Sequence, residues 1–352
     1  MDLEFCRRRI DELDIKLLEL LNARAEISLQ IGAIKAQAGK AIHDPVRENQ
    51  VRANVAAANR GPLGGAALRA IFREIMSAMS DLQRPRRIAY LGPVATFTHQ
   101  AAHSRFGGGG EFIPARTIAD VFSLAEKGEA DYGVVPIENS TDGVVGHTLD
   151  LLADSELQIC SEISLPISQH LLSRGDLGSI LRVYSHPQAL AQCRAWLRDN
   201  LPNAELMEVS STARAAEMAA SDPTVAAIAN ELAAEEYGLS FVRRRIEDNP
   251  ANRTRFLVIG RSMGERSGND RTSILFSIKH RVGALHDALE AFLSHDVNLT
   301  RIESRPSRRK AWEYLFFVDA VGHPEDDNLG AALAELSKAC MFVKVLGAWP
   351  AE

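Results

Sequence analysis

Cysteine is scarce in this chain of 352 residues, and no two cysteines form a CxxC pair. The four that occur are Cys6, Cys160, Cys193 and Cys340. This scatter is typical of reduced thiols in a cytosolic protein. His99 and His103 stand four residues apart, but no nearby acidic residue completes a metalloprotease motif. The sequence therefore predicts no bound metal.

Long apolar runs and a large excess of charge are also missing. No stretch approaches the length needed to span a membrane, and the N-terminus lacks the apolar segment of a signal peptide. The formal net charge of −6 argues against a general nucleic-acid binder, so local arginine and lysine clusters would have to hold any anionic ligand. We expect a cytoplasmic protein of two or three domains, with no nucleic-acid or membrane partner.

The most informative stretch that is present is residues 132–145, which read YGVVPIENSTDGVV. The β-branched apolar run from Tyr132 to Ile137 predicts a buried strand that ends in a block of polar residues. Ligands in α/β proteins often bind beyond the carboxyl ends of strands, and Ser140 or Thr141 could cap a following helix that favours an anion. The alternative is a strand–turn–helix corner whose polar residues satisfy only the backbone. These residues alone leave both readings open.

The first 83 residues have the periodicity of helices. Apolar side chains recur at helical spacing over residues 2–38, with Gly39 as a stop signal. Asp44-Pro45 then reads as the N-cap and first-turn proline of a second helix, which is expected to run through about Ala58. A third helix is expected over residues 66–83. The first module is therefore predicted to be three helices, one of them unusually long.

Charges on the long helix are spaced to hold a small dianion. Arg24 and Lys35 lie about three turns apart on nearly one face, at a distance of roughly 16 Å along the axis. Arg7 lies about 25 Å from Arg24 on the same axis, so it can join that site only from a second, antiparallel chain. The alternative is that all these charges only solvate an amphipathic bundle.

The full pattern of charges resembles the all-helical chorismate mutases. The residues that carry this resemblance are Arg7, Arg24, Lys35, Asp44, Arg47, Glu48 and Gln83. The resemblance implies an intertwined homodimer in which the partner chain donates Arg7. Met79 stands where that family often has a small hydroxyl residue, which is a departure from the pattern.

The chemistry that this resemblance implies is a unimolecular rearrangement of chorismate to prephenate, without a covalent intermediate or a metal. The two carboxylates of the substrate would be clamped by Arg7, Arg24 and Arg47. The ether oxygen gains negative charge as its C–O bond breaks, and the donors aimed at it would be Lys35 and Gln83. The substrate hydroxyl would be bound by Glu48 and Asp44, which would also orient the arginines.

The pattern changes after residue 87 to alternating strands and helices. This part is expected to form two small lobes, near residues 88–165 and 181–250, with a cleft between them and a returning segment at 252–256. The predicted strands are residues 88–91, 132–137, 157–163, 181–184, 206–209, 225–228 and 256–259. Residues 107–110, a run of four glycines, lack the motif of a phosphate-binding loop and read as a turn.

Four motifs in this region together resemble prephenate dehydratase. They are GPVATFTHQAA (92–102), YGVVPIENSTDGVV (132–145), SHPQALAQC (185–193) and NRTRF (252–256). The first motif departs from the family at three positions, where Glu, Gly and Ser are common and this chain has Val94, Ala95 and Thr98. The hydroxyl at position 98 is retained.

The dehydratase resemblance implies loss of the ring hydroxyl and of a carboxylate as CO₂, to leave phenylpyruvate. Thr254 would donate a hydrogen bond to the departing oxygen, and Arg255 would bind a carboxylate. The rest of the site would comprise Thr96, Glu138, Asn139, Ser140, Thr141 and Phe256. The alternative is that Thr254 is an ordinary strand residue and Arg255 a surface charge.

Residues 271–350 are predicted to follow a βαββαβ order, as in ferredoxin-like units. GALHDALEAF (283–292) and NLTRIESRP (298–306) resemble the ACT regulatory domain, with Val282 where proline is usual. The resemblance implies a phenylalanine site made by Gly283, Ala284, Leu285, Asn298, Leu299, Glu303, Ser304, Arg305 and Pro306. The alternative is a dimerisation module that binds no ligand.

The predicted fold class is therefore multidomain. Residues 1–84 would form an all-α chorismate mutase module, 86–264 a two-lobed α/β dehydratase module like periplasmic binding proteins, and 271–350 an α+β ACT domain. The chain is interpreted as a bifunctional enzyme of phenylalanine biosynthesis that is inhibited by L-phenylalanine, needs no cofactor and forms a homodimer or larger homo-oligomer. The alternatives are a dehydratase that prefers arogenate and a non-catalytic binding protein.

Overall fold

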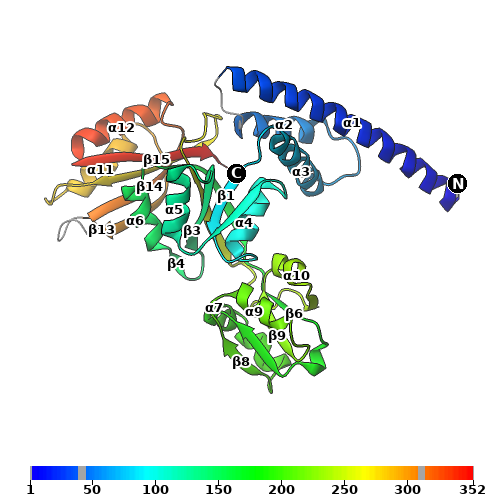
Figure 1. Cartoon of the computed structure of the whole chain (residues 1–352). Coiled ribbons are helices and arrows are strands. Elements are labelled where there is room, and N and C mark those ends of the chain that lie inside the picture. Colours follow the sequence, from blue (N-terminus) through cyan, green and yellow to red (C-terminus); the bar gives the residue numbers. More distant parts are fainter. Residues whose placement is uncertain (1, 39–44, 308–313, 352) are drawn as a thin grey trace. The chain divides into compact units, whose positions relative to one another are not determined.

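The computed structural model describes residues 2–38, 45–307 and 314–351 (Figure 1). The chain divides into two compact units, Met1–Arg87 with His103–Glu111, and Ile88–Ala102 with Phe112–Glu352. Gly39 and Asp44, which the sequence assigned to a helix stop and an N-cap, lie outside the described residues. None of the described helices has the length and apolar character needed to cross a membrane.

The first unit contains three helices, α1 (Leu3–Gln37), α2 (Pro45–Ala58) and α3 (Gly65–Gln83). Helix α1 begins where the Asp2 carboxylate accepts a hydrogen bond from the Phe5 N–H at 2.7 Å, which satisfies a free donor of the first turn. Helix α3 packs against both α1 and α2, and it buries Leu68, Met76 and Met79. Most apolar side chains of α1 remain exposed in the single chain.

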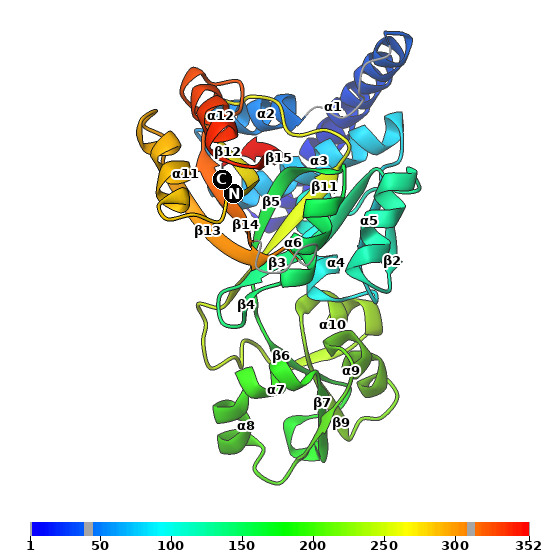
Figure 2. The ribbon, with the colours of Figure 1, turned by 90° about the vertical axis from the view of Figure 1, so that its left-hand side faces the viewer.

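The second unit is built on a sheet of ten described strands in the order β13-β14-β12-β15-β5-β11-β3-β1-β2, with β4 paired to β3. One part of this sheet, which we call the dehydratase part after the resemblance in its sequence, comprises β1 (Arg87–Leu91), β2 (Glu111–Ala115), β3 (Tyr132–Asn139), β4 (Gly143–Val144), β5 (Gln158–Pro166) and β11 (Arg253–Gly260). The helices of this part are α4 (Phe97–Phe106), α5 (Ile118–Lys127) and α6 (Gly146–Asp154). Helices α5 and α6 lie against β3, β5 and β11 and bury an apolar core with them (Figure 2).

A smaller sheet has the order β10-β6-β9-β7-β8. Its strands are β6 (His170–Ser173), β7 (Arg182–Ser185), β8 (Glu205–Glu208), β9 (Val225–Ala229) and β10 (Ser240–Arg243). Four helices and a short 3₁₀ turn (Leu177–Ser179) accompany it, and the helices are α7 (Pro187–Gln192), α8 (Arg194–Asn200), α9 (Thr212–Ala219) and α10 (Glu231–Tyr237). The chain leaves the larger sheet after β5 and returns to it in β11, which inserts between β5 and β3.

The C-terminal part has the predicted βαββαβ order. It comprises β12 (Asp270–Ser277), α11 (Ala284–Leu293), β13 (Leu299–Pro306), β14 (Tyr314–Val321), α12 (Asp327–Ala339) and β15 (Phe342–Pro350). Along β14 the side chains alternate in direction. Phe316, Val318 and Ala320 pack in a core with α11 and α12, whereas Phe317 packs in the core of the dehydratase part.

Backbone pairing and side-chain hydrogen bonds join the C-terminal strands to the dehydratase part. In the sheet, β15 runs parallel to β5, and the paired residues are Gly347 and Ile159. Lys344 of β15 donates hydrogen bonds to the carbonyl oxygens of Leu152, Ala153 and Ser155, and thereby caps the C-terminal end of α6.

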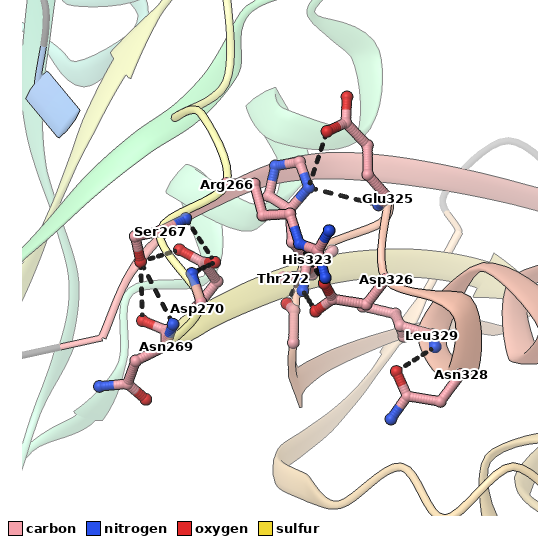
Figure 3. A network of polar contacts seen from close by, with 12 residues as sticks. Arg266, Ser267, Asn269, Asp270, Thr272, His323, Glu325, Asp326, Asn328 and Leu329 are labelled. Atoms are coloured by element: carbon pink, nitrogen blue, oxygen red, sulfur yellow. Dashed lines mark hydrogen bonds and ion pairs between the residues drawn. The ribbon is translucent and has the colours of Figure 1, made fainter.

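The covalent connection after β11 is held by a polar network (Figure 3). The His323 Nε2 atom lies 3.2 Å from the Gly264 carbonyl oxygen, and Arg266 forms an ion pair with Asp326 at 2.6 Å. The Asp270 carboxylate accepts hydrogen bonds from the Ser267 hydroxyl and backbone N–H. The segment leading into β12 is therefore fixed to the loop between β14 and α12.

Most of the elements predicted from the sequence are confirmed, with ends that differ by at most four residues. Strands β2, β6 and β10 and the short β4 were not predicted. One helix start was wrong: Ser140 and Thr141 do not cap α6, because a turn and the short strand β4 follow β3 first. Helix α6 begins only at Gly146, after Val145, without a side-chain cap.

Candidate active sites

A cavity of about 470 Å³ lies between the three helices of the first unit. Its charged and amide lining residues are Arg24, Lys35, Arg47, Glu48 and Gln83. The remaining lining residues are mostly apolar, and Met79 and Ser80 are both among them. A cavity of this size with several cations and mostly apolar walls suits a compact anionic ligand.

Two residues that line this cavity, Arg24 and Gln83, each have a buried polar atom. Among the described residues, no hydrogen-bond partner reaches the buried Arg24 Nη1 atom or the buried Gln83 Oε1 atom. Burial lowers the pKa of Arg24 below its ordinary value, because it removes the guanidinium from water. Unsatisfied buried groups are costly, so a ligand that bound them would recover that free energy.

The cavity residues Glu48 and Arg47 also contact neighbouring side chains, whereas Arg7 lies elsewhere. Glu48 lies within 3.9 Å of Arg105 and 3.8 Å of Arg52, and Arg47 donates to Gln50 at 2.7 Å. Arg7 does not line the cavity; its side chain is exposed and pairs with Glu4 at 3.2 Å. Asp44 lies outside the described residues.

In the second unit, the ends of β3 and β11 form a compact polar cluster. Thr254 and Asn139 are paired across these strands, and Asn139 Nδ2 donates to Thr254 Oγ1 at 2.7 Å. The Asn139 Oδ1 atom accepts from the backbone N–H groups of Thr141 and Asp142. Because the Thr254 oxygen accepts from Asn139, its own hydroxyl proton is free to be donated to another oxygen.

Asn252 belongs to this cluster but was not predicted as a site residue. Its Oδ1 atom accepts from Asn139 Nδ2 at 3.0 Å and from the Ser140 hydroxyl at 3.2 Å. The side chain is buried, and its Nδ2 atom has no hydrogen-bond partner among the residues the structure describes. Its position at the start of the NRTRF motif was the signal that could have identified it.

The first and third dehydratase motifs also make polar contacts across the second unit. Gln188 Nε2 donates to the Asp142 carboxylate, and Asn230 Nδ2 donates to the Ala95 carbonyl oxygen at 3.1 Å. Ala95 has a positive φ of 64°, a conformation that glycine adopts with less strain. The positive φ is a physical reason for the glycine that the family commonly has at this position.

Arg255 lies beside Thr254 in sequence but points to the other face of the strand. It donates four hydrogen bonds, to the carboxylates of Glu138, Glu162 and Asp319. Burial alone would lower the pKa of Arg255, but the hydrogen bonds and charges of Glu162 and Asp319 raise it above its ordinary value. The structure thus surrounds Arg255 with protein carboxylates.

Two further predicted dehydratase residues, Thr96 and Phe256, contact other parts of the protein. The Thr96 hydroxyl donates to the Leu91 carbonyl oxygen at 2.9 Å and accepts from the His99 N–H at 3.3 Å. The Phe256 side chain is only 2% exposed, so it packs in the interior rather than at a surface.

The predicted effector residues lie at the start of α11 and along β13. Gly283 has a positive φ of 80° and precedes α11, while Leu285 and Leu299 pack in the core of the C-terminal part. Arg305 forms a two-point ion pair with Asp150 of α6, at 3.0 and 3.2 Å. The other positions are Ala284, which is buried, Glu303, which is partly buried, and Asn298, Ser304 and Pro306, which are exposed.

Comparison with known families gives three matches along the chain. The chorismate mutase type II family matches residues 6–84, the prephenate dehydratase family residues 88–264 and the ACT domain residues 272–338. A bifunctional chorismate mutase/prephenate dehydratase from Aquifex aeolicus (strain VF5) is 48% identical, over 99% of this chain and 98% of the relative.

Solved structures resemble the second unit. A prephenate dehydratase from Arthrobacter aurescens, in complex with L-Phe, is 37% identical, with a TM-score of 0.69 over 75% of this chain and 90% of that one. GqqA, described as a novel type of quorum quenching acylase, is 31% identical, with a TM-score of 0.70 over 76% of this chain and 98% of that one.

These comparisons define an enzyme with two catalytic modules and a C-terminal ACT domain. The chain belongs to the family of bifunctional chorismate mutase/prephenate dehydratases. The family, the fold class and the two enzymatic activities expected from the sequence are thereby confirmed.

Proposed function

We propose that this chain rearranges chorismate to prephenate in residues 1–84 and converts prephenate to phenylpyruvate in residues 86–264. We further propose that L-phenylalanine inhibits it by binding to residues 271–350. The observation that carries the proposal is the cation-lined cavity of the first unit, where buried Arg24 and Gln83 atoms lack partners among the described residues. The family membership supports the same two reactions.

For the mutase step, we assign the substrate carboxylates to Arg24 and Arg47, together with Arg7 of a second copy. Lys35 and Gln83 donate to the ether oxygen as its bond to carbon breaks, and Glu48 and Asp44 bind the hydroxyl. The electrons move within one substrate molecule, so the protein only has to hold the reactive shape and stabilise developing charge. Their shared cavity supports this assignment for Arg24, Lys35, Arg47, Glu48 and Gln83.

A homodimer is proposed because α1 exposes apolar side chains along its length. Exposed fractions reach 56% for Leu13, 54% for Leu17 and 64% for Ile34, and such a stripe on a long helix is typical of a surface that another chain covers. An antiparallel partner helix would also bring a second Arg7 to the cavity, which the copy in its own chain does not line.

For the dehydratase step, we assign the leaving hydroxyl to Thr254. The C–CO₂ bond breaks and its electron pair aromatises the ring, while the ring C–O bond breaks and its pair leaves with oxygen, which takes up a proton to become water. The Thr254 hydroxyl donates to that oxygen, and Asn139 holds Thr254 in place through the 2.7 Å bond. Ser140 and Thr141 complete the substrate-binding loop.

In this proposal four residues hold the site in shape and do not contact the substrate. They are Arg255, Glu138, Thr96 and Phe256. The hydrogen bonds of Arg255 and Thr96 to protein groups, and the burial of Phe256, support that assignment. Neither reaction as proposed uses a metal or a cofactor. A cytoplasmic location is proposed because four cysteines without disulfides suit a reducing compartment.

The effector site is assigned to the start of α11 and to β13, which forms one edge of the larger sheet. The residues are Gly283, Ala284, Leu285, Asn298, Leu299, Glu303, Ser304, Arg305 and Pro306. The solved relative that was bound to L-Phe supports phenylalanine as the effector. A second ACT domain at this edge would place the ligand between two chains.

The test follows product formation from chorismate and from prephenate, each with and without L-phenylalanine. We expect prephenate and then phenylpyruvate from chorismate, phenylpyruvate from prephenate, and a slower dehydratase step when phenylalanine is present. Chorismate or prephenate that reacts no faster than in buffer would refute the corresponding activity. A dehydratase rate that does not respond to phenylalanine would refute the assigned regulation alone.

A further inference from the structure

Five charged side chains from five strands meet in the second unit, and we name them the Arg255 cluster. They are Glu138 (β3), Glu162 (β5), Arg255 (β11), Arg301 (β13) and Asp319 (β14). Arg255 lies 3.0 Å from Glu138, 2.7 Å from Glu162 and 3.1 Å from Asp319. The same Glu138 oxygen also lies 3.2 Å from Arg301 Nε, so it is shared by two guanidinium groups.

The cluster joins two parts of the sheet. Arg301 and Asp319 belong to strands of the ACT domain, whereas Glu138, Glu162 and Arg255 belong to the dehydratase part. Asp319 points out of the ACT sheet on the same side as Phe317, which packs in the dehydratase core. Arg301 therefore links the ACT strands to Glu138, and Asp319 links them to Arg255.

Burial makes these ion pairs strong determinants of position. The Asp319 side chain is 5% exposed and that of Arg301 is 12% exposed. A charge so far from water is stable only when partners stay in place, and removal of one partner leaves the other uncompensated. Although burial lowers the pKa of Arg255, the carboxylates of Glu162 and Asp319 raise it above its ordinary value, which agrees with close pairing of these charges.

The cluster lies directly behind the proposed catalytic donors. Arg255 is paired with Glu138 across β11 and β3, and the next pair is Thr254 with Asn139. Because neighbouring residues of a strand point to opposite faces, the Arg255–Glu138 bond is on one face and the Asn139–Thr254 bond on the other. The register of β11 and β3 shifts immediately after Arg255, where a bulge interrupts the ladder. On its other side β11 pairs with β5 without a shift from Arg253 to Val258, so the interruption concerns only the β3 side. The side-chain bonds therefore add to what holds the end of β3 against β11.

We propose that Asp319 and Arg301 of the ACT domain are positioning residues of the dehydratase reaction, which act through Arg255 and Glu138 on the placement of Thr254 and Asn139. This inference rests on the proposed dehydratase function. The two ACT side chains touch no reacting atom. They fix the end of the β11–β3 pair, so that the Thr254 hydroxyl stays aimed at the leaving oxygen.

The test uses the full chain with Asp319→Asn, which keeps the size of the side chain and removes its charge. We expect kcat for prephenate to fall about tenfold to a hundredfold with little change in KM, because small displacements of a catalytic donor are costly. Arg301→Gln should have the same effect, and Arg301→Lys should recover much of the loss, because lysine still places a cation near Glu138. The mutase rate of each variant should remain that of the unsubstituted chain.

Asp326→Asn is the matched control, because Asp326 of the ACT domain forms an ion pair with Arg266 of the segment before β12 and not with a residue of the cluster. It should leave kcat for prephenate unchanged. The inference is overturned if Asp319→Asn keeps the original kcat, if Arg301→Lys is as slow as Arg301→Gln, or if the loss only follows the fraction of unfolded protein. Failure of the proposed function is distinct: the unsubstituted chain would then leave prephenate intact, which would overturn both.

Discussion

At the scale of single residues, the geometry of the mutase cavity depends on the absence of a side chain at Gly32. A Cβ atom at this position of α1 would lie 2.9 Å from Cγ and 3.2 Å from Cβ of Gln83 on α3. These distances are shorter than ordinary carbon contacts, so Gln83 would have to move. Gly32 therefore allows the close approach that brings the Gln83 amide into the cavity.

Gly32→Ala should separate stability from catalysis. Alanine in a helix interior is favoured over glycine by up to about 1 kcal/mol, so the helix itself should not be weakened. The displaced Gln83 should nevertheless lower kcat for chorismate by about tenfold or more, because a donor is moved from the reacting oxygen. Rates on chorismate and prephenate, with Gln83→Ala for comparison, check this. A full mutase rate in the folded Gly32→Ala protein would contradict the assigned role of Gln83.

The two proposed active sites should fail independently. Lys35→Ala should abolish the rearrangement of chorismate and leave the dehydration of prephenate intact. The measurement is the rate on each substrate separately, with thermal unfolding as the check on folding. Equal losses of both activities would refute the separation into two sites.

Thr254→Ala should give the opposite result. Loss of the hydroxyl should slow phenylpyruvate formation by about 10²–10⁴-fold, the range for a positioned proton donor, while the mutase rate is kept. Thr254→Ser is the matched control, because it retains the hydroxyl and loses only a methyl group. A near-normal rate for Thr254→Ala would remove this residue from the mechanism.

Helical spacing related two of the mutase residues to each other, whereas Arg47, Glu48 and Gln83 were expected from the resemblance to chorismate mutases. Arg24 and Lys35 could be placed together from their separation alone, and both line the cavity. The role of Arg255 could not be read in this way. Its buried partner Asp319 is 64 residues away, and only the folded sheet brings them together.

At the scale of elements, the joint between β15 and β5 requires glycine. Gly347 has a φ of +151°, and a Cβ atom there would lie 2.2 Å from the carbonyl oxygen and 2.4 Å from the nitrogen of Ile159. The obstructing atoms belong to the backbone and cannot rotate aside. The close approach of the two strands is therefore possible only without a side chain at this position.

Gly347→Ala should lower the free energy of unfolding by roughly 2–4 kcal/mol, because it combines a disfavoured φ with a clash against backbone. Gly268→Ala is the control, since Gly268 also has a positive φ, of 88°, but no atom lies within 4 Å of the added carbon. It should cost only about 1 kcal/mol. Denaturant unfolding of both variants measures the difference. Equal losses would show that the close approach contributes nothing.

Several of the shorter strands were not predicted from the sequence. Strands β6 and β10 have four residues each, and β4 has two, and such short segments carry little alternating pattern. The start of α6 was misplaced for a related reason. Polar residues that could cap a helix also make turns, and here Asn139 accepts the backbone N–H groups of Thr141 and Asp142 instead.

At the scale of the whole molecule, the proposed donation of Arg7 between chains makes a specific prediction. A dimer of Arg7→Ala with Arg24→Ala would contain one site with both arginines intact and one site with neither. Co-expression of the two inactive variants should therefore restore about a quarter of the mutase activity if chains pair at random. Each variant expressed alone is the control. No recovery from co-expressed chains that associate would contradict donation between chains.

The apolar core of the dehydratase part contains side chains from both ends of the second unit. Leu275, Phe317, Leu346 and Trp349 of the ACT strands are buried in the same cluster as Ile159 and Leu257. A chain that ended at residue 264 would lose these four ACT side chains and expose the rest of this core to water. The catalytic and regulatory parts should therefore unfold in a single calorimetric transition, because each completes the interior of the other.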